Sequence, residues 1–188
     1  MRITGGAARG IQLTAPKGDG TRPATDQLRE AVFSSLGSRV EGARIADFFA
    51  GTGAYGLEAM SRGACSGLFV ENSREVMACL KKNLSAVAKS CGASSSNWRV
   101  LAQKVYTIPV GLGPFDIVFM DPPYAMIEER MPQIFEEHIS KVVGPDGVVC
   151  FEMPGNLDLD LTGWDVIRRL GKKGKDKPTA VFYQKRQP

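Results

Sequence analysis

Apolar runs of strand length alternate with stretches of helical spacing along most of the chain. The runs occupy residues 43–49, 67–70, 98–101, 115–120, 147–153, 164–170 and 180–184. Strands that alternate with helices are typical of a mostly parallel sheet. The last two runs are joined by a short lysine-rich turn, so this closing pair predicts an antiparallel strand. The pattern indicates an α/β fold with a seven-stranded sheet.

The first 40 residues stand outside this alternation. Residues 2–4 and 10–15 flank a glycine-rich segment, which predicts a small hairpin or an irregular loop between short strands. Apolar residues at four-residue spacing then predict a helix that is capped by Thr25 or Asp26 and closed by Gly37. We expect one domain over residues 1–188, in which residues 1–40 are an extension and residues 41–188 the core.

A later helix ends near Val143 and contains both Pro132 and the sole histidine, His138. We expect Pro132 in the first turn, because a proline in the interior kinks a helix. His138 belongs to an apolar stripe of helical period, which indicates a histidine at the edge of the core.

Charge and cysteine content narrow the classes of function. The net charge is only +4, so any surface that binds nucleic acid must be local. No apolar stretch approaches the ~20 residues that span a bilayer, and no signal-peptide pattern opens the chain; we expect a cytoplasmic protein. The scattered cysteines and lone histidine predict no metal site. The four cysteines are Cys65, Cys79, Cys91 and Cys150.

A glycine-rich turn follows the first core strand. Residues 51–56 read Gly-Thr-Gly-Ala-Tyr-Gly and lead into a helical pattern. Gly51 and Gly53 permit a tight turn whose backbone approaches a ligand closely. Glu71 ends the next strand about 20 residues later, where a dinucleotide-binding fold places its ribose-binding carboxylate. This pattern alone fits NAD as well as S-adenosylmethionine.

Asp47 precedes the turn, in the run Asp47-Phe48-Phe49-Ala50-Gly51. A carboxylate at this place repels a pyrophosphate and attracts a cationic methionine group, which favours S-adenosylmethionine. The alternatives are an acid that binds nearby backbone amides, for Asp47, and an acid at a helix N-terminus, for Glu71. We predict a cofactor site that contains Asp47, Phe49, Gly51, Gly53 and Glu71.

Asp121-Pro122-Pro123-Tyr124 follows the apolar run 115–120. A carboxylate and a proline carbonyl both accept hydrogen bonds, and a tyrosine ring offers a stacking face. Together they suit a planar amino group on a nucleobase that is presented to an electrophile. An ordinary turn also uses Asp and Pro, but the glycine turn upstream favours a methyl-transfer site in which Asp121 also borders the cofactor.

The chain resembles the RsmD-type methyltransferases, which methylate the exocyclic N2 of one guanine in 16S ribosomal RNA. The resemblance spans almost the whole length. It rests on the order and spacing of Arg2-Ile3-Thr4-Gly5-Gly6, Arg9-Gly10, Arg22-Pro23-Ala24-Thr25-Asp26, Arg29-Glu30, the glycine turn and residues 121–124. It implies a Rossmann-like fold, S-adenosylmethionine as cofactor and 16S rRNA as substrate, within a small subunit or an assembly intermediate, with the protein a monomer.

For this reaction we predict roles for single residues from their chemistry. Asp121 and the Pro122 carbonyl accept the N2 hydrogens while Tyr124 stacks on the guanine, and the methyl group transfers in line. Arg2, Arg9, Arg22 and Arg29 lie outside the cofactor core and are candidates for RNA phosphates, with solvent-exposed arginines that only aid solubility as the alternative. The cluster Lys172, Lys173, Lys175 and Lys177 is either a second basic patch or a solvated turn.

One departure concerns the adenine of the cofactor. Where the family usually has Asp or Asn, this chain has Gln103-Lys104, so the adenine contact stays unassigned. Three other functions remain open: a DNA amino-methyltransferase, an NAD-dependent dehydrogenase and a non-catalytic RNA-binding assembly factor. Methylation assays on DNA and rRNA, and a thermal-shift comparison of NAD with S-adenosylmethionine, separate these functions.

Overall fold

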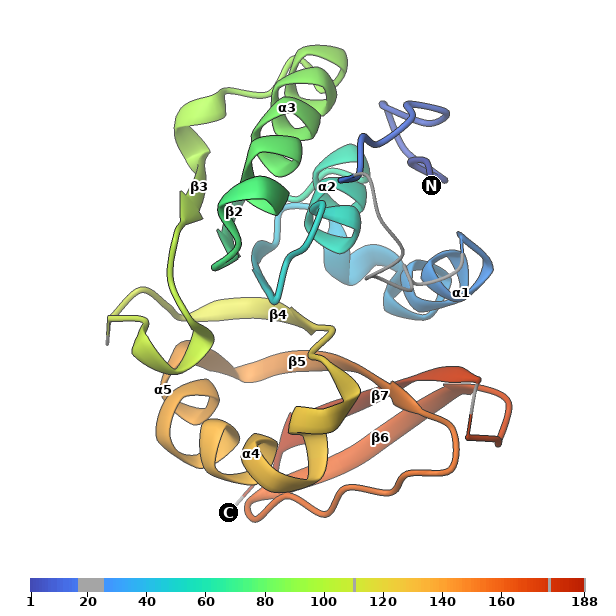
Figure 1. The fold of residues 1–188 in the computed structure, drawn as a ribbon, viewed down its shortest axis with the longest axis vertical. Coiled ribbons are helices and arrows are strands. Elements are labelled where there is room, and N and C mark those ends of the chain that lie inside the picture. The colour runs from blue at the N-terminus through green and yellow to red at the C-terminus, as the bar shows by residue number, and fades with distance from the viewer. Residues whose placement is uncertain (17–25, 110, 176, 188) are drawn as a thin grey trace.

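One sheet forms the middle layer of the part of the chain that this computed structural model describes, residues 1–16, 26–109, 111–175 and 177–187 (Figure 1). Its seven strands are β1 (Arg44–Phe48), β2 (Ser66–Val70), β3 (Trp98–Leu101), β4 (Phe115–Met120), β5 (Val143–Pro154), β6 (Trp164–Gly171) and β7 (Pro178–Lys185).

The strand order is β3-β2-β1-β4-β5-β7-β6, and β7 alone runs antiparallel to its neighbours β5 and β6. The predicted fold class is therefore confirmed, including the antiparallel closing strand. The order reverses between β1 and β4, which pair in parallel although two strands separate them in sequence. Open α/β sheets bind ligands at such a switch point, beyond the carboxyl ends of the strands.

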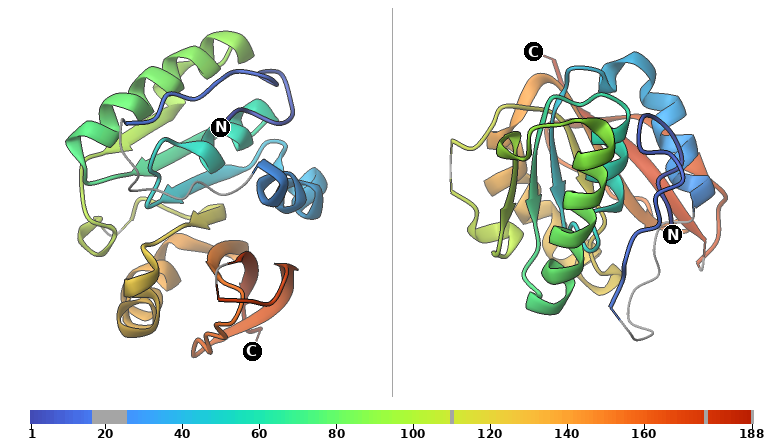
Figure 2. Two further views of the ribbon diagram at one scale, coloured as in Figure 1. Left: turned by 45° about the vertical axis from the view of Figure 1, so that its right-hand side comes forward. Right: turned by 90° about the horizontal axis from the view of Figure 1, so that it is seen from above.

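Helices cover both faces of the sheet (Figure 2). Those on one face pack into one apolar cluster, and those on the other face into a second. The first group is α1 (Asp26–Leu36), α2 (Ala54–Ser61) and α3 (Arg74–Cys91); the second is α4 (Ile127–Ile134) and α5 (Ser140–Val142). Four short 3-10 helices lie at Gly37–Val40, Ser95–Asn97, Val105–Thr107 and Tyr124–Met126, and a π-helix at Phe135–Ile139.

Pro132 lies in the interior of α4 and not in the first turn, so that prediction is wrong. Proline lacks the N–H that would bond to the carbonyl of Glu128, four residues earlier. The π-helix Phe135–Ile139 follows directly, and its looser turn accommodates the disrupted hydrogen-bond ladder. Buried Ile127, Met131 and Ile134 hold the helix on the sheet in spite of the proline.

The predicted N-terminal hairpin is present in reduced form. Arg2 and Gln12 form a single antiparallel bridge, and the N–H of Ile3 donates to the carbonyl of Ile11 at 2.9 Å. Ile3 is fully buried. The hairpin therefore packs against the core through its own apolar side chain.

A buried carboxylate on α2, Glu58, ties this hairpin to the core. Glu58 has no exposed surface, and it accepts hydrogen bonds from the N–H groups of Thr4 (2.7 Å) and Gly5 (2.8 Å) and from the Thr4 hydroxyl (2.8 Å). It also forms ion pairs with Arg62 (2.8 Å) and with Arg29 of α1 (3.5 Å). One side chain thus joins the hairpin, α1 and α2.

We predict that Glu58→Gln lowers the free energy of unfolding by roughly 3 kcal/mol, because removing one partner of a buried ion pair leaves an uncompensated charge. Urea denaturation at pH 7 measures the loss, with Glu30→Gln, an exposed glutamate on α1, as the control. Equal stability of the two variants would show that the Glu58 network does not hold the hairpin.

Candidate active site

Three carboxylates lie on one face of the sheet, on adjacent strands at the switch point. Asp47 is on β1, Asp121 follows β4, and Glu152 is on β5. Asp47 is level with Phe119, and Phe119 with Cys150. Since alternate residues of a strand share a face, Asp121 and Glu152 stand side by side, one step beyond Asp47.

The glycine turn connects β1 to α2 as predicted. Gly51 and Gly53 have φ angles of 55° and 85°, which favour glycine. A Cβ on Gly53 would also lie 2.4 Å from the Cδ1 atom of Leu80, so α3 packs directly on the turn. At Gly51 a Cβ would meet only the carbonyl oxygen of Phe49, at 4.0 Å, so the backbone conformation alone favours glycine.

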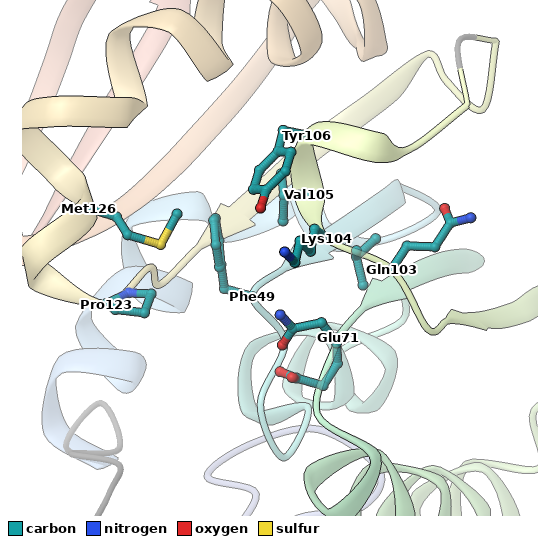
Figure 3. A pocket seen from close by; sticks show the side chains of 10 residues that line it. Phe49, Glu71, Gln103, Lys104, Val105, Tyr106, Pro123 and Met126 are labelled. Carbon is teal, nitrogen blue, oxygen red and sulfur yellow. The ribbon is translucent and has the colours of Figure 1, made fainter.

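Phe49 has a φ angle of 62°, which is unusual for a residue with a side chain. Such strain persists where surrounding structure enforces it, often at functional sites. Its ring lines a pocket with Glu71, Gln103, Lys104 and six other residues (Figure 3). The pocket brings Phe49 and Glu71, two of the predicted cofactor residues, together.

Asp47 is almost fully buried, and its Oδ2 atom accepts a hydrogen bond from the N–H of Gly56 in the first turn of α2 at 2.8 Å. Burial, and to a lesser extent the negative charge of Glu71, raises the pKa of Asp47 to about 8, although the Gly56 bond acts in the opposite direction. Asp47 thus holds the turn by a backbone amide, the alternative considered for it above. Its role toward a cofactor stays a prediction.

Glu71 connects two other backbone segments. One oxygen accepts from the N–H of Gly51 at 3.0 Å, and the other from the N–H of Ser73, the N-cap of α3, at 2.7 Å. The carboxylate therefore braces the glycine turn against the start of a helix, where its charge is favourable. It stands at the pocket wall, so ribose binding stays a prediction consistent with its position.

Residues 103–106 form one wall of the pocket and include Gln103 and Lys104, which stand where the family usually has Asp or Asn. The amino group of Lys104 lies 5.6 Å from the centre of the Tyr106 ring, while the exposed amide of Gln103 points away from the other labelled side chains (Figure 3). Val105 is buried. The side chain of Gln103 is thus a poor adenine contact in this conformation.

Asp121-Pro122-Pro123-Tyr124 begins where β4 ends. Asp121 is half-buried and Pro122 buried, whereas the Tyr124 side chain is 38 % exposed. Pro123 lines the pocket, and its carbonyl accepts a hydrogen bond from the N–H of Met126 at 2.9 Å. Asp121, a hydrogen-bond acceptor, thus lies three residues before an accessible ring, Tyr124.

Two residues of this site were not predicted from the sequence, Tyr55 and Glu152. The Tyr55 hydroxyl donates to Oε2 of Glu152 at 2.9 Å, and its ring stacks on Phe119 at 5.3 Å. Burial raises the pKa of Glu152 to about 7, and burial together with the charges of Glu152 and Asp47 raises that of Asp121 well above its usual range. An acid directly after the apolar run 148–151 was the available signal, because buried strands rarely contain one.

The four arginines proposed for RNA differ in position. Arg2 and Arg9 are exposed, and Arg2 pairs with Asp26 at 3.6 Å. Arg29 is fully buried and pairs with Asp26 and Glu58, so its predicted contact with RNA is wrong in this structure. A buried guanidinium needs partners within the protein. Arg22 lies outside the described residues.

Cys65 is exposed and only Cys150 is buried among the four cysteines. Within residues 1–16, 26–109, 111–175 and 177–187, no three His, Cys, Asp or Glu side chains gather as a metal site would require. None of the helices in these ranges has the length and apolar content to span a membrane.

Comparisons with known proteins agree with this geometry. The family model described as "Conserved hypothetical protein 95" matches residues 1–183. "Ribosomal RNA small subunit methyltransferase D" of Escherichia coli K12 is 39% identical over 134 residues, which cover 70% of this chain and 65% of that protein. "Putative rRNA methyltransferase YlbH" of Bacillus subtilis is 29% identical over 171 residues, 89% of this chain and 90% of its own.

The solved structure "Putative methyltransferase yhhF from Escherichia coli" superposes on this chain with a TM-score of 0.79 at 30% identity. The alignment covers 100% of this chain and 99% of that one. The chain therefore shares the whole fold of that protein, although its match to the curated Escherichia coli relative spans about two-thirds of the relative's length.

We predict that Asp47→Asn changes how stability depends on pH. The folded protein holds the Asp47 proton more tightly than the unfolded chain does, so wild-type stability falls as pH rises from about 4 to about 8. Asparagine keeps an acceptor for the Gly56 N–H and removes this titration. Relative to pH 5, the variant should therefore gain at least ~1 kcal/mol over wild type at pH 8.5.

Urea denaturation at both pH values measures this gain. Asp146→Asn, which changes an exposed acid, is the matched control and should show no gain. Parallel stability curves for wild type and Asp47→Asn would contradict the buried, proton-holding carboxyl.

Proposed function

Since the chain belongs to the RsmD-type rRNA methyltransferase family, we propose that it transfers a methyl group from S-adenosylmethionine to the exocyclic N2 of one guanine in small-subunit rRNA. The observation that carries the proposal is the position of Asp121, at the carboxyl end of β4 and next to the pocket that Glu71 and Phe49 line. An acceptor for an amino group and a pocket for a cofactor meet at the switch point.

The residues of the pocket fit S-adenosylmethionine. Phe49, Val70 and Val105 supply apolar walls for a flat base, and Glu71 supplies carboxylate oxygens that would accept hydrogen bonds from ribose hydroxyls. Gly51 has no side chain and only one neighbouring atom near where a Cβ would lie, which lets a ligand approach the turn. Asp47 and Asp121 are acids whose ionised forms a cationic methionine group beside them would favour.

When bound, S-adenosylmethionine supplies an electrophilic methyl group on a positively charged sulfur. Asp121 and the Pro122 carbonyl would accept the two N2 hydrogens of the target guanine, so that the nitrogen lone pair is released from the ring and faces the methyl group. These hydrogen bonds strengthen as the nitrogen becomes positive, and thus stabilise the transition state more than the bound substrate. Tyr124 would stack on the base and hold its plane.

The printed names of the relatives support rRNA as the substrate class. The target base must leave its helix or loop to reach Asp121, which costs a few kcal/mol and favours a nucleotide that is already unpaired. The exposed Arg2 and Arg9 of the hairpin are candidates for phosphate contacts. Lys172, Lys173, Lys175 and Lys177 are also exposed and would supply a second, salt-sensitive contact.

We predict that Asp121→Ala lowers the rate of methyl transfer at least ~100-fold, because it removes an acceptor aimed at charge that develops in the transition state. Labelled S-adenosylmethionine, unmethylated small-subunit particles and mapping of the methylated nucleotide measure the effect. Glu136→Gln, an exposed acid on the far side of the sheet, is the control. Methylation of DNA or of another RNA instead would contradict the proposal. So would the absence of any methylated product although S-adenosylmethionine binds.

We predict a preference for a protein-bearing particle over protein-free rRNA. The chain has few elements beyond the core with which to read RNA, so ribosomal proteins would present the target loop. Single-turnover rates on assembled particles and on naked 16S rRNA, at one salt concentration, decide this point. Equal or faster transfer to naked rRNA would contradict it.

A further inference from the structure

Glu152 is a second carboxylate at the acceptor, and strand pairing sets its place there. Met120 of β4 is level with Phe151 of β5, so the next residues, Asp121 and Glu152, are neighbours across the two parallel strands. Both stand on the face that packs against α2, the face of Phe119 and Cys150. An acid at this position of a central strand does not contribute to apolar packing.

Tyr55 and burial restrict the Glu152 carboxylate. Glu152 is 4 % exposed, and the Tyr55 hydroxyl holds its Oε2 atom at 2.9 Å. Tyr55 is itself fixed between Phe33 of α1 and Phe119 of β4, with ring centroids at 6.4 and 5.3 Å. Tyr55 of α2 therefore orients the Glu152 carboxylate, and the charge of that carboxylate acts on Asp121 at the end of β4.

The surroundings contain more negative than positive groups. Asp47 of β1 faces the pair from one side, and the Cys150 thiol lies two residues before Glu152 on the same face. The positive group that acts on Glu152 is the buried Arg29 of α1, whose Nη1 atom has no hydrogen-bond partner in the described structure. Two carboxylates side by side at low solvent access do not both ionise readily, so they tend to share one proton.

We infer, on the basis of the methyl transfer proposed above, that Glu152 is a positioning residue for Asp121: the two carboxyl groups share one proton at rest, and once that proton has left, the charge of Glu152 makes Asp121 a stronger base for the N2 proton. As the N–C bond forms and the S–C bond breaks, the sulfur becomes neutral and the nitrogen cationic. The N–H bond then breaks, its electron pair stays on nitrogen, and Asp121 takes the proton. The pair ends the step with one proton more.

The first test is the pH dependence of methyl transfer. Asp121 must be ionised to act, so the rate of wild type should fall at acid pH. In Glu152→Gln the neighbouring charge is gone, Asp121 loses its proton at lower pH, and the acidic limb should move down by about one pH unit or more. Tyr55→Phe should move it in the same direction by less, because Glu152 then keeps its proton to higher pH.

A purely structural Glu152 would lower the rate at every pH and leave the limb in place, which would overturn the inference. Glu136→Gln carries the same chemical change on the surface and should match wild type. Circular dichroism and melting temperature at pH 7 confirm that the variants fold.

The second test needs no substrate and holds even if methyl transfer is not found. Both acids bind their protons more tightly in the folded protein than in the unfolded chain, so the melting temperature of wild type should fall between pH 5 and pH 8. Asp47 contributes part of this fall in every variant. Glu152→Gln and Asp121→Asn should each reduce the fall by a few degrees relative to wild type and Glu136→Gln, and the two reductions should not add in the double variant. An unchanged fall, or two reductions that add, would show that Glu152 and Asp121 share no proton.

If wild type transfers no methyl group while the reductions in Glu152→Gln and Asp121→Asn do not add, the proposed function fails and the shared proton stands. If wild type transfers methyl groups but Glu152→Gln changes neither the acidic limb of the rate nor the fall in melting temperature between pH 5 and pH 8, the inference fails and the proposed function stands.

Discussion

The helix α2 is the constraint on which the site and the N-terminal hairpin both depend. Its first turn holds Asp47 through the Gly56 N–H and Glu152 through the Tyr55 hydroxyl, and its last turn holds the hairpin through Glu58. A buried carboxylate without a partner destabilises the fold, so each of these three acids needs its contact. The contacts reach the helix from β1, β5 and the hairpin. Eight residues thereby set the distance between the hairpin and the acceptor.

The sequence predicted the structure correctly where a short stretch of residues permits only one local conformation. Gly51 and Gly53 permit a turn that few other residues adopt, and the apolar run 115–120 followed by Asp121 defines a strand and its end. It failed where partners come from distant segments. Arginine is usually a surface residue. Arg29 is buried because Glu58 and Asp26, brought together by the tertiary fold, pair with its guanidinium. Pro132 is tolerated because packing of α4 outweighs a local preference.

The role of Glu152 illustrates the same limit. An acid in a strand is detectable in the sequence, but its neighbour is set by the register of β4 and β5, which pair across the 22 intervening residues from 121 to 142. The alternating faces of the strands then decide that Asp47, Asp121 and Glu152 converge and do not point to opposite sides. Such convergence destabilises the fold, and functional sites commonly retain this kind of strain.

The antiparallel strand β7 has a consequence for the acidity of the carboxyl pair. It pairs with β5 along the stretch that contains Glu152, with Ala180 level with Glu152. A strand that leaves a sheet opens its neighbour's edge to water, and hydration returns a buried carboxyl toward its ordinary acidity. The proton affinity of the pair is therefore coupled to the docking of a strand that contains none of the predicted site residues.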